Sequence, residues 1–266
     1  ALGADYAGPN PGKALNLLHL FFGVGAIVSP LIVSFTQSIW QSWRPVFGII
    51  GALPIIVNLI LLTLPIKPLG NSATVQGASP YRSLFLWTMG LTAFVYVGIE
   101  VSSYGWLPSL WKSLFKTGII PPILTSTIFW LALTLGRFFT GRIADRMGLS
   151  RFLASISVGV LIMTVIWWAT VATSWSIGVV FILGLFLAGV YPTIMAVVAV
   201  RFPGRTGEIS AFVSIFSSLG GALIPSGIGR IADLVDITEL PLLIGGLALI
   251  LIMGAFAAWR FNNREA

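Results

Sequence analysis

Eight long apolar stretches constrain this chain more than any other feature. They occupy residues 14–35, 45–64, 83–110, 122–139, 152–173, 175–200, 209–231 and 241–261. Most are near the ~20 residues that a helix needs to cross ~30 Å of hydrocarbon. They are continuously apolar rather than alternating, which excludes a β-barrel. Only 9% of the residues are charged, against about 25% in soluble domains. We therefore expect an all-α polytopic membrane protein with eight transmembrane helices.

The basic residues predict how these helices are oriented. If the first tail is inside and the stretches alternate, eleven of the fifteen Lys and Arg residues fall on the inner side and four on the outer side. Lys and Arg accumulate in cytoplasmic loops. We therefore expect a multi-pass protein of a cell membrane, plasma or inner, with both termini in the cytoplasm.

One connection is longer than the others and divides the chain. Residues 66–82 are rich in Gly, Ser and Pro, a composition typical of a linker. We predict a cytoplasmic tail or loop over residues 1–13, two helices over 14–65, this cytoplasmic linker, six helices over 83–261 and a cytoplasmic tail over 262–266.

The densest charge cluster is Gly136–Arg151, which carries four arginines and one aspartate. We expect a tight cytoplasmic loop here, between two membrane helices. The pentapeptide Gly-Arg-Ile-Ala-Asp begins at Gly141 and again at Gly229, three helices later. Those copies fall on opposite membrane faces, as an inverted repeat of three helices predicts.

A second internal match relates the first helix to the seventh. Phe21, Gly25 and Pro30 recur as Phe216, Gly220 and Pro225, at an offset of 195 residues. The period is thus six helices in parallel orientation. Three-helix inverted units inside six-helix halves describe the major facilitator superfamily.

Specific segments resemble this superfamily. The segment from Gly141 to Gly148, with Arg151 after it, resembles its signature loop. Residues 15–30, 94–108 and 189–211 are similar to the fifth, seventh and tenth helices of its fucose-permease-like branch, the fucose–galactose–glucose:proton symporters. The polar fifth helix of fucose permease itself is replaced here by Leu-Phe-Phe after His19. The resemblance implies the last two helices of an N-terminal bundle and a complete six-helix C-terminal bundle, with the first four helices missing. A genuine eight-helix protein is the alternative.

This resemblance implies a secondary active transporter that works by alternating access. We expect proton-coupled uptake of a sugar. The alternatives are an efflux antiporter for drugs or metabolites and a non-transporting membrane sensor. The implied partners are a small solute, protons and membrane lipid, but not nucleic acid, and the full-length protein is expected to be monomeric.

Glu100 is the one acidic residue deep inside an apolar stretch. An intramembrane carboxylate is costly and faces a cavity or a partner. We interpret it as a proton-coupling or substrate-binding group, with a packing role as the alternative. His19, the only histidine, and Asn16 lie one turn apart near the end of the first helix. They are further candidates for a polar cavity, or for hydrogen bonds between helices.

Aromatic residues accompany Glu100 in the stretches that line the cavity in the family. Aromatic rings suit the C–H faces of sugars, and their edges carry hydrogen-bonding groups. As a set we expect some of them to contact substrate, although each one alone is more often a packing residue. The candidates are Tyr96, Tyr104, Trp106, Trp130 and Tyr191.

Two further groups of residues have conformational interpretations. We interpret Gly141, Arg142, Asp145, Arg146 and Gly148 as a charge latch at the cytoplasmic face, which holds one conformation and releases the other. The alternative is that the arginines only set topology. Pro192 and Pro225 are hinge candidates, because proline removes a backbone hydrogen bond and kinks a helix.

Other classes of function lack their sequence signatures. A membrane-embedded enzyme needs a cluster of His, Asp or Glu, and a pump needs a nucleotide-binding loop; neither pattern occurs. We therefore expect no enzymatic activity, no catalytic residue, no metal site and no cofactor.

Overall fold

The computed structural model describes residues 11–42, 44–63, 79–115 and 120–263, and the side chains of all of these except 11–20 and 262–263. All secondary structure in these ranges is helical. Eight helical spans among the described residues are long and apolar enough to cross a membrane. The prediction of an all-α polytopic membrane protein is therefore confirmed.

The chain divides into two compact units, residues 1–76 and 77–266. The first contains α2 (Pro11–Trp40) and α3 (Arg44–Leu62). Many described side chains of α2 and most of those of α3 are apolar and exposed. Such surfaces need lipid or another protein surface to cover them.

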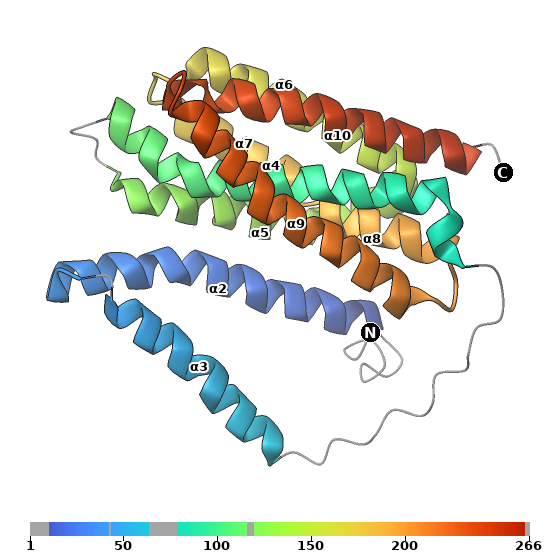
Figure 1. Cartoon of the computed structure of the whole chain (residues 1–266), viewed down its shortest axis with the longest axis horizontal. Coiled ribbons are helices and arrows are strands. Elements are labelled where there is room, and N and C mark those ends of the chain that lie inside the picture. Colours follow the sequence, from blue (N-terminus) through green and yellow to red (C-terminus); the bar gives the residue numbers. More distant parts are fainter. Residues whose placement is uncertain (1–10, 43, 64–78, 116–119, 264–266) are drawn as a thin grey trace. The chain divides into compact units, whose positions relative to one another are not determined.

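The second unit is a bundle built around one central helix. Its helices are η1 (Pro80–Arg82), α4 (Leu84–Leu114), α5 (Pro122–Met147), α6 (Leu149–Thr170), α7 (Ser176–Leu187), α8 (Val190–Arg201), α9 (Thr206–Ala232), η2 (Ile237–Glu239) and α10 (Leu240–Asn263). α4 packs against α9, α10 and α5, whereas α10 also packs along α6 (Figure 1). Leu86, Met89, Ile99 and Leu107 of α4 are fully buried.

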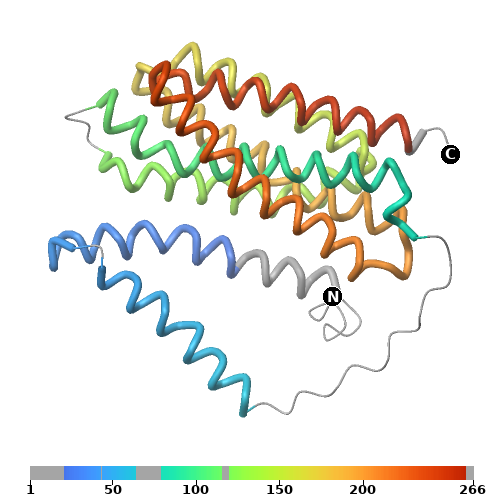
Figure 2. The backbone as a smooth tube through the Cα atoms, in the orientation of Figure 1, coloured from blue at the N-terminus to red at the C-terminus, as the bar shows by residue number. Residues whose placement is uncertain are grey.

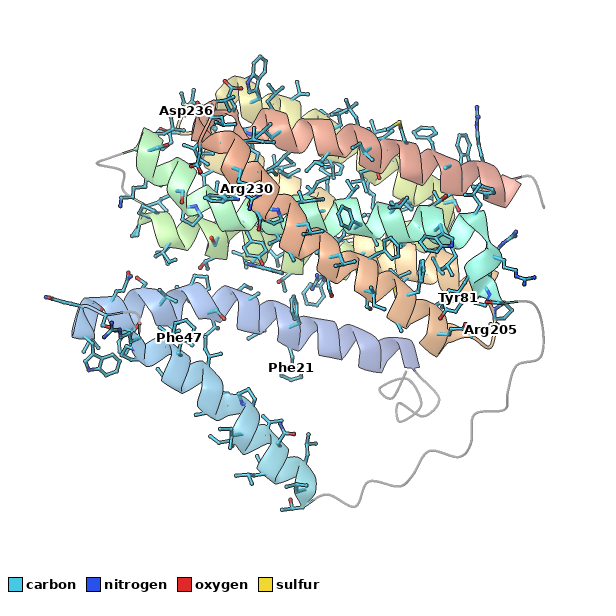
Figure 3. All side chains as sticks on the ribbon, viewed as in Figure 1. Phe21, Phe47, Tyr81, Arg205, Arg230 and Asp236 are labelled. Atoms are coloured by element: carbon cyan, nitrogen blue, oxygen red, sulfur yellow. The ribbon has the colours of Figure 1, made fainter. Side chains whose placement is uncertain are left out.

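Glycines let α4 and α9 approach closely. A Cβ atom built on Gly220 would collide with the backbone of Phe94, and one built on Gly98 would collide with Ile224. Glycine permits such contact because it has no side chain. α9 crosses the whole unit, with Arg205 near Tyr81 at its start and Arg230 towards Asp236 at its end (Figure 3).

The sixth span is broken into α7 and α8 at Ala188 and Gly189. Proline at 192 supplies the reason. Pro192 has no N–H to donate to the carbonyl of Ala188, and its ring crowds that carbonyl. α9, by contrast, continues through Pro225. Figure 2 traces the backbone of the second unit from teal, at its first helix, to red, at its last.

The expectation of a loop over Gly136–Arg151 is wrong in its extent. α5 continues to Met147 and α6 starts at Leu149, so the connection is Gly148 alone. Gly148 has φ +83°, a conformation that glycine adopts without steric cost. Its backbone N–H donates to the carbonyl of Ala144 and caps α5. The arginines thus extend the helix, because Arg is a good helix former.

Candidate functional site

Three polar or aromatic residues form one stripe along α4. Tyr96, Glu100 and Tyr104 are four residues apart, so they lie on the same face of the helix. Tyr96 is fully buried and Glu100 is 8% exposed. Glu100 stands near the middle of the 31-residue helix, deep in the membrane-spanning segment. Only a polar or hydrogen-bonding neighbourhood makes such a carboxyl tolerable.

α5 presents a matching stripe to this face. Ser126 donates a hydrogen bond to the carbonyl of Tyr104 at 2.8 Å. The rings of Trp130 and Tyr104 lie 5.0 Å apart between centroids, tilted by 49°. Thr134 and Arg137 continue the stripe at helical spacing. Ser126 and Trp130 thus fix the register of α5 against α4.

α8 and α9 complete the site from the other side. The Tyr191 ring of α8 stacks on Tyr96, with centroids 6.2 Å apart and planes 25° apart. The Tyr191 hydroxyl lies 3.5 Å from the Ser214 Oγ of α9. The break before α8 lies two residues from Tyr191, so it lies next to this ring stack.

Electrostatic interactions link the groups at the centre of the site. Glu100 interacts with Tyr96 and with Arg137 across the α4–α5 contact. The Tyr96 hydroxyl lies close to the Glu100 carboxyl, yet it has no hydrogen bond of good geometry with any described residue. An enclosed hydroxyl without a partner is costly. The cluster therefore has hydrogen-bonding capacity for a proton, a water or a solute.

The site has no donor set for a metal. Within the described ranges, no group of three or more His, Cys, Asp or Glu side chains is placed to hold an ion. What the arrangement offers is one carboxyl, one guanidinium, several hydroxyls and four aromatic rings.

Comparison with known proteins identifies the family. The sequence model of the Major Facilitator Superfamily matches residues 1–225. The chain belongs to the major facilitator superfamily. This is a family of transporters rather than of enzymes, and it agrees with the eight apolar spans.

Two solved structures share its fold. FucP, a Major Facilitator Superfamily transporter solved in the outward conformation, matches with a TM-score of 0.69, at 17% identity over 96% of this chain and 70% of that chain. A single-residue variant of FucP, the E. coli fucose:proton symporter, matches with the same TM-score and identity, over 96% of this chain and 71% of that chain. The predicted major facilitator fold is thus confirmed.

One curated relative is covered over a smaller share of its length than the two solved structures. Bypass of stop codon protein 6 of Saccharomyces cerevisiae is 23% identical over 275 residues, which are 87% of this chain and 54% of that protein. The chain therefore spans about half the length of this relative.

Five of the predicted binding residues gather in this major facilitator bundle. They are Tyr96, Glu100, Tyr104, Trp130 and Tyr191. Trp106 lies elsewhere, since its Nε1 donates to the carbonyl of Pro225 at 3.0 Å and its ring covers Gly229. It joins α4 to α9. The side chains of Asn16 and His19 lie outside the described residues.

The latch candidates lie at the end of α5. Arg142, Asp145 and Arg146 are exposed there, next to the Gly148 turn. Within the part of the chain that the structure describes, Asp145 forms no ion pair, whereas Arg205 pairs with Glu208 at 3.5 Å. A latch through Asp145 would thus need a partner beyond these contacts.

Sequence reasoning missed Arg137 and Ser126 as site residues. Arg137 was counted among the basic residues of the loop, although it lies ten residues before the end of α5. The spacing of Ser126, Trp130, Thr134 and Arg137 was the available signal, because these positions share one helical face.

Proposed function

We propose that this protein carries a small polar solute, with a sugar favoured, across the membrane together with a proton. The observation that carries the proposal is Glu100, a buried carboxyl in mid-membrane surrounded by aromatic rings. The coarser conclusion, a transporter of the major facilitator superfamily, rests on the family match.

The rings support a sugar as the solute. Tyr96, Tyr104, Trp130 and Tyr191 come from three helices and offer both faces and polar edges. A sugar ring presents apolar C–H faces to aromatic rings and hydroxyls to polar groups. One of the two FucP structures is that of the E. coli fucose:proton symporter, and it shares this fold at 17% identity.

Glu100 supports coupling to protons. A charged carboxylate inside a bilayer is expensive, so the uptake of a proton changes the energy of the site substantially. The Tyr96–Tyr191 stack lies close to both Glu100 and the α7–α8 break. A proton on Glu100 can therefore influence the packing of α8, which is how a binding event biases alternating access.

The test is uptake by the protein expressed from its native gene and reconstituted in liposomes with an inward proton gradient. We expect the wild type to accumulate labelled sugar above the equilibrium level. Glu100→Gln should abolish accumulation but retain exchange of sugar across the membrane. Glu239→Gln, at a half-buried carboxyl in the connection between α9 and α10, is the matched control. Accumulation that survives in the Glu100 variant refutes the coupling role.

An efflux antiporter is the second candidate, because the same four aromatic rings also suit planar apolar drugs. The direction of transport decides between the two. Sugar that enters with protons supports symport, whereas a dye that leaves against an inward proton gradient supports antiport. Failure to move any of these solutes would favour the third alternative, a non-transporting sensor on the same fold.

We also propose that both termini face the cytoplasm. The chain has no cysteine, so single cysteines report sidedness directly. Leu234→Cys, 85% exposed between α9 and α10, should react with an impermeant maleimide added to intact cells. Ala266→Cys should react only after permeabilisation, and the reverse pattern contradicts this orientation.

A further inference from the structure

Arg137 lies opposite the Glu100 stripe at the same depth in the bundle. α4 and α5 run antiparallel, and Tyr104 contacts both Ser126 and Trp130. Residues of decreasing number along α4 therefore lie beside residues of increasing number along α5. This register brings Arg137 level with Tyr96, one helical turn from Glu100. The stripe that includes Trp130 and Thr134 directs Arg137 to the same face.

Arg137 is an intramembrane residue rather than a loop residue. It lies inside the apolar stretch of residues 122–139, five residues before Arg142, the first exposed charged residue of α5, which is roughly 7.5 Å along a helix. Its Nε and Nη1 atoms are enclosed. Its electrostatic interactions include Glu100 and Tyr96. A guanidinium stays protonated under all physiological conditions, so its positive charge is a fixed property of the site.

The fixed charge determines which solute fits a protonated Glu100. With Glu100 ionised and no solute bound, the two charges balance. When Glu100 takes up a proton, the site gains a net positive charge in a low-dielectric environment, which is costly. A neutral solute leaves that cost in place, whereas a solute with one negative charge removes it. No other acidic residue of the sequence lies inside an apolar stretch.

We propose that Arg137 binds the carboxylate of an anionic solute once a proton has neutralised Glu100. The solute class is a sugar acid, such as a hexuronate. Its carboxylate matches the planar fork of a guanidinium through two parallel hydrogen bonds, and its ring lies against the aromatic side chains of α4, α5 and α8. The step is not covalent. One proton and one anion enter together and leave together. The proposal rests on the proposed function, whose substrate class and coupling it specifies.

The titratable groups near Glu100 are few. They are Tyr96 and Tyr104 on α4, Arg137 on α5 and Tyr191 on α8. The other carboxyls among the described residues of the second unit lie at helix ends or connections, at Asp145, Glu208, Asp233, Asp236 and Glu239. Phenols do not ionise in the physiological range, so Glu100 is the group whose titration changes the charge of this cluster.

The test compares glucuronate with glucose, two probes that differ by one carboxylate. Binding to the protein expressed from its native gene is followed by tryptophan fluorescence at about pH 5.5 and about pH 8. We expect glucuronate to bind at least about tenfold more tightly than glucose at the lower pH, and to lose this advantage at the higher pH. Glu100→Gln, a permanent mimic of the protonated state, should retain glucuronate binding at both pH values.

Variants of the arginine complete the test. Arg137→Gln should abolish the preference for glucuronate while glucose binding remains. Arg137→Lys keeps the charge without the fork and should lower glucuronate affinity about tenfold. It also serves if the glutamine variant fails to fold. Arg151→Gln, at an exposed arginine of α6, is the control and should match the wild type.

The outcomes separate this inference from the proposed function. The inference is overturned if glucose is carried with protons and binds with the same affinity as glucuronate at both pH values. The proposed function then still stands. Glucuronate preference that persists in Arg137→Gln also overturns it. If neither probe is bound or moves with protons, the proposed sugar–proton symport fails as well.

Discussion

Replacing Gly220 by alanine tests the closest contact in the second unit. A Cβ atom there would lie 2.6 Å from the carbonyl carbon and 2.8 Å from the Cα of Phe94, and closer still to its carbonyl oxygen. Carbon atoms in contact normally lie about 3.5–4.0 Å apart. The obstacle is backbone rather than the end of a flexible side chain, so α4 and α9 must separate by roughly 1 Å.

The cost follows from this separation. Overpacking of a well-packed core typically costs about 1–3 kcal/mol. Each kcal/mol lowers the melting temperature of a domain of this size by about 2–4 °C. We therefore expect an apparent melting temperature in detergent about 2–12 °C lower than that of the control, measured by tryptophan fluorescence during heating.

The control for this substitution is Gly227→Ala on the same helix. A Cβ atom at Gly227 meets nothing within 4 Å, so alanine there gains helix propensity without a collision. Comparing the two variants removes the propensity effect that both share. Equal melting temperatures would refute the close packing of α4 on α9 described above.

The remaining predictions concern one hydrogen bond and one cap. Trp106→Phe removes the hydrogen bond to the Pro225 carbonyl and should cost about 0.5–1.5 kcal/mol of stability. We expect a lower melting temperature and unchanged sugar binding. A loss of sugar binding would place Trp106 in the site. The backbone N–H of Thr238 donates to Asp236 at 2.8 Å and lowers the pKa of that carboxyl. The stabilisation is therefore complete above its ordinary pKa of 3.8 and disappears as pH falls through the lowered value. The melting temperatures of wild type and Asp236→Asn should differ most above about pH 4 and converge below it; a difference independent of pH would exclude this role.

The spans were predictable because hydropathy sets them directly. A stretch of apolar residues long enough to cross the bilayer must satisfy its backbone internally, and a helix does so. The break in the sixth span was also predictable, since Pro192 removes one specific hydrogen bond. The end of α5 was not, because charged residues mark the membrane boundary rather than the helix end. Helix and hydrocarbon lengths need not coincide.

The site was predictable in part. Glu100 and its flanking tyrosines stand out by their spacing on one helix, but their partners come from helices distant in sequence. Nothing in the sequence distinguishes Trp106, which packs on α9, from Trp130, which lies beside Tyr104. Arg137 was obscured by the three arginines that follow it. Only the register of α5 against α4 separates it from them.

The central claim is that Glu100 carries the proton, and solute-induced proton movement tests it most directly. Sugar, or the glucuronate named above, is added to lightly buffered liposomes that contain the native protein, and the external pH is recorded. We predict that the medium becomes alkaline with the wild type as protons enter with the solute. Glu100→Gln should give no pH change while still exchanging labelled solute. Alkalinisation of equal rate and extent in that variant would contradict the account.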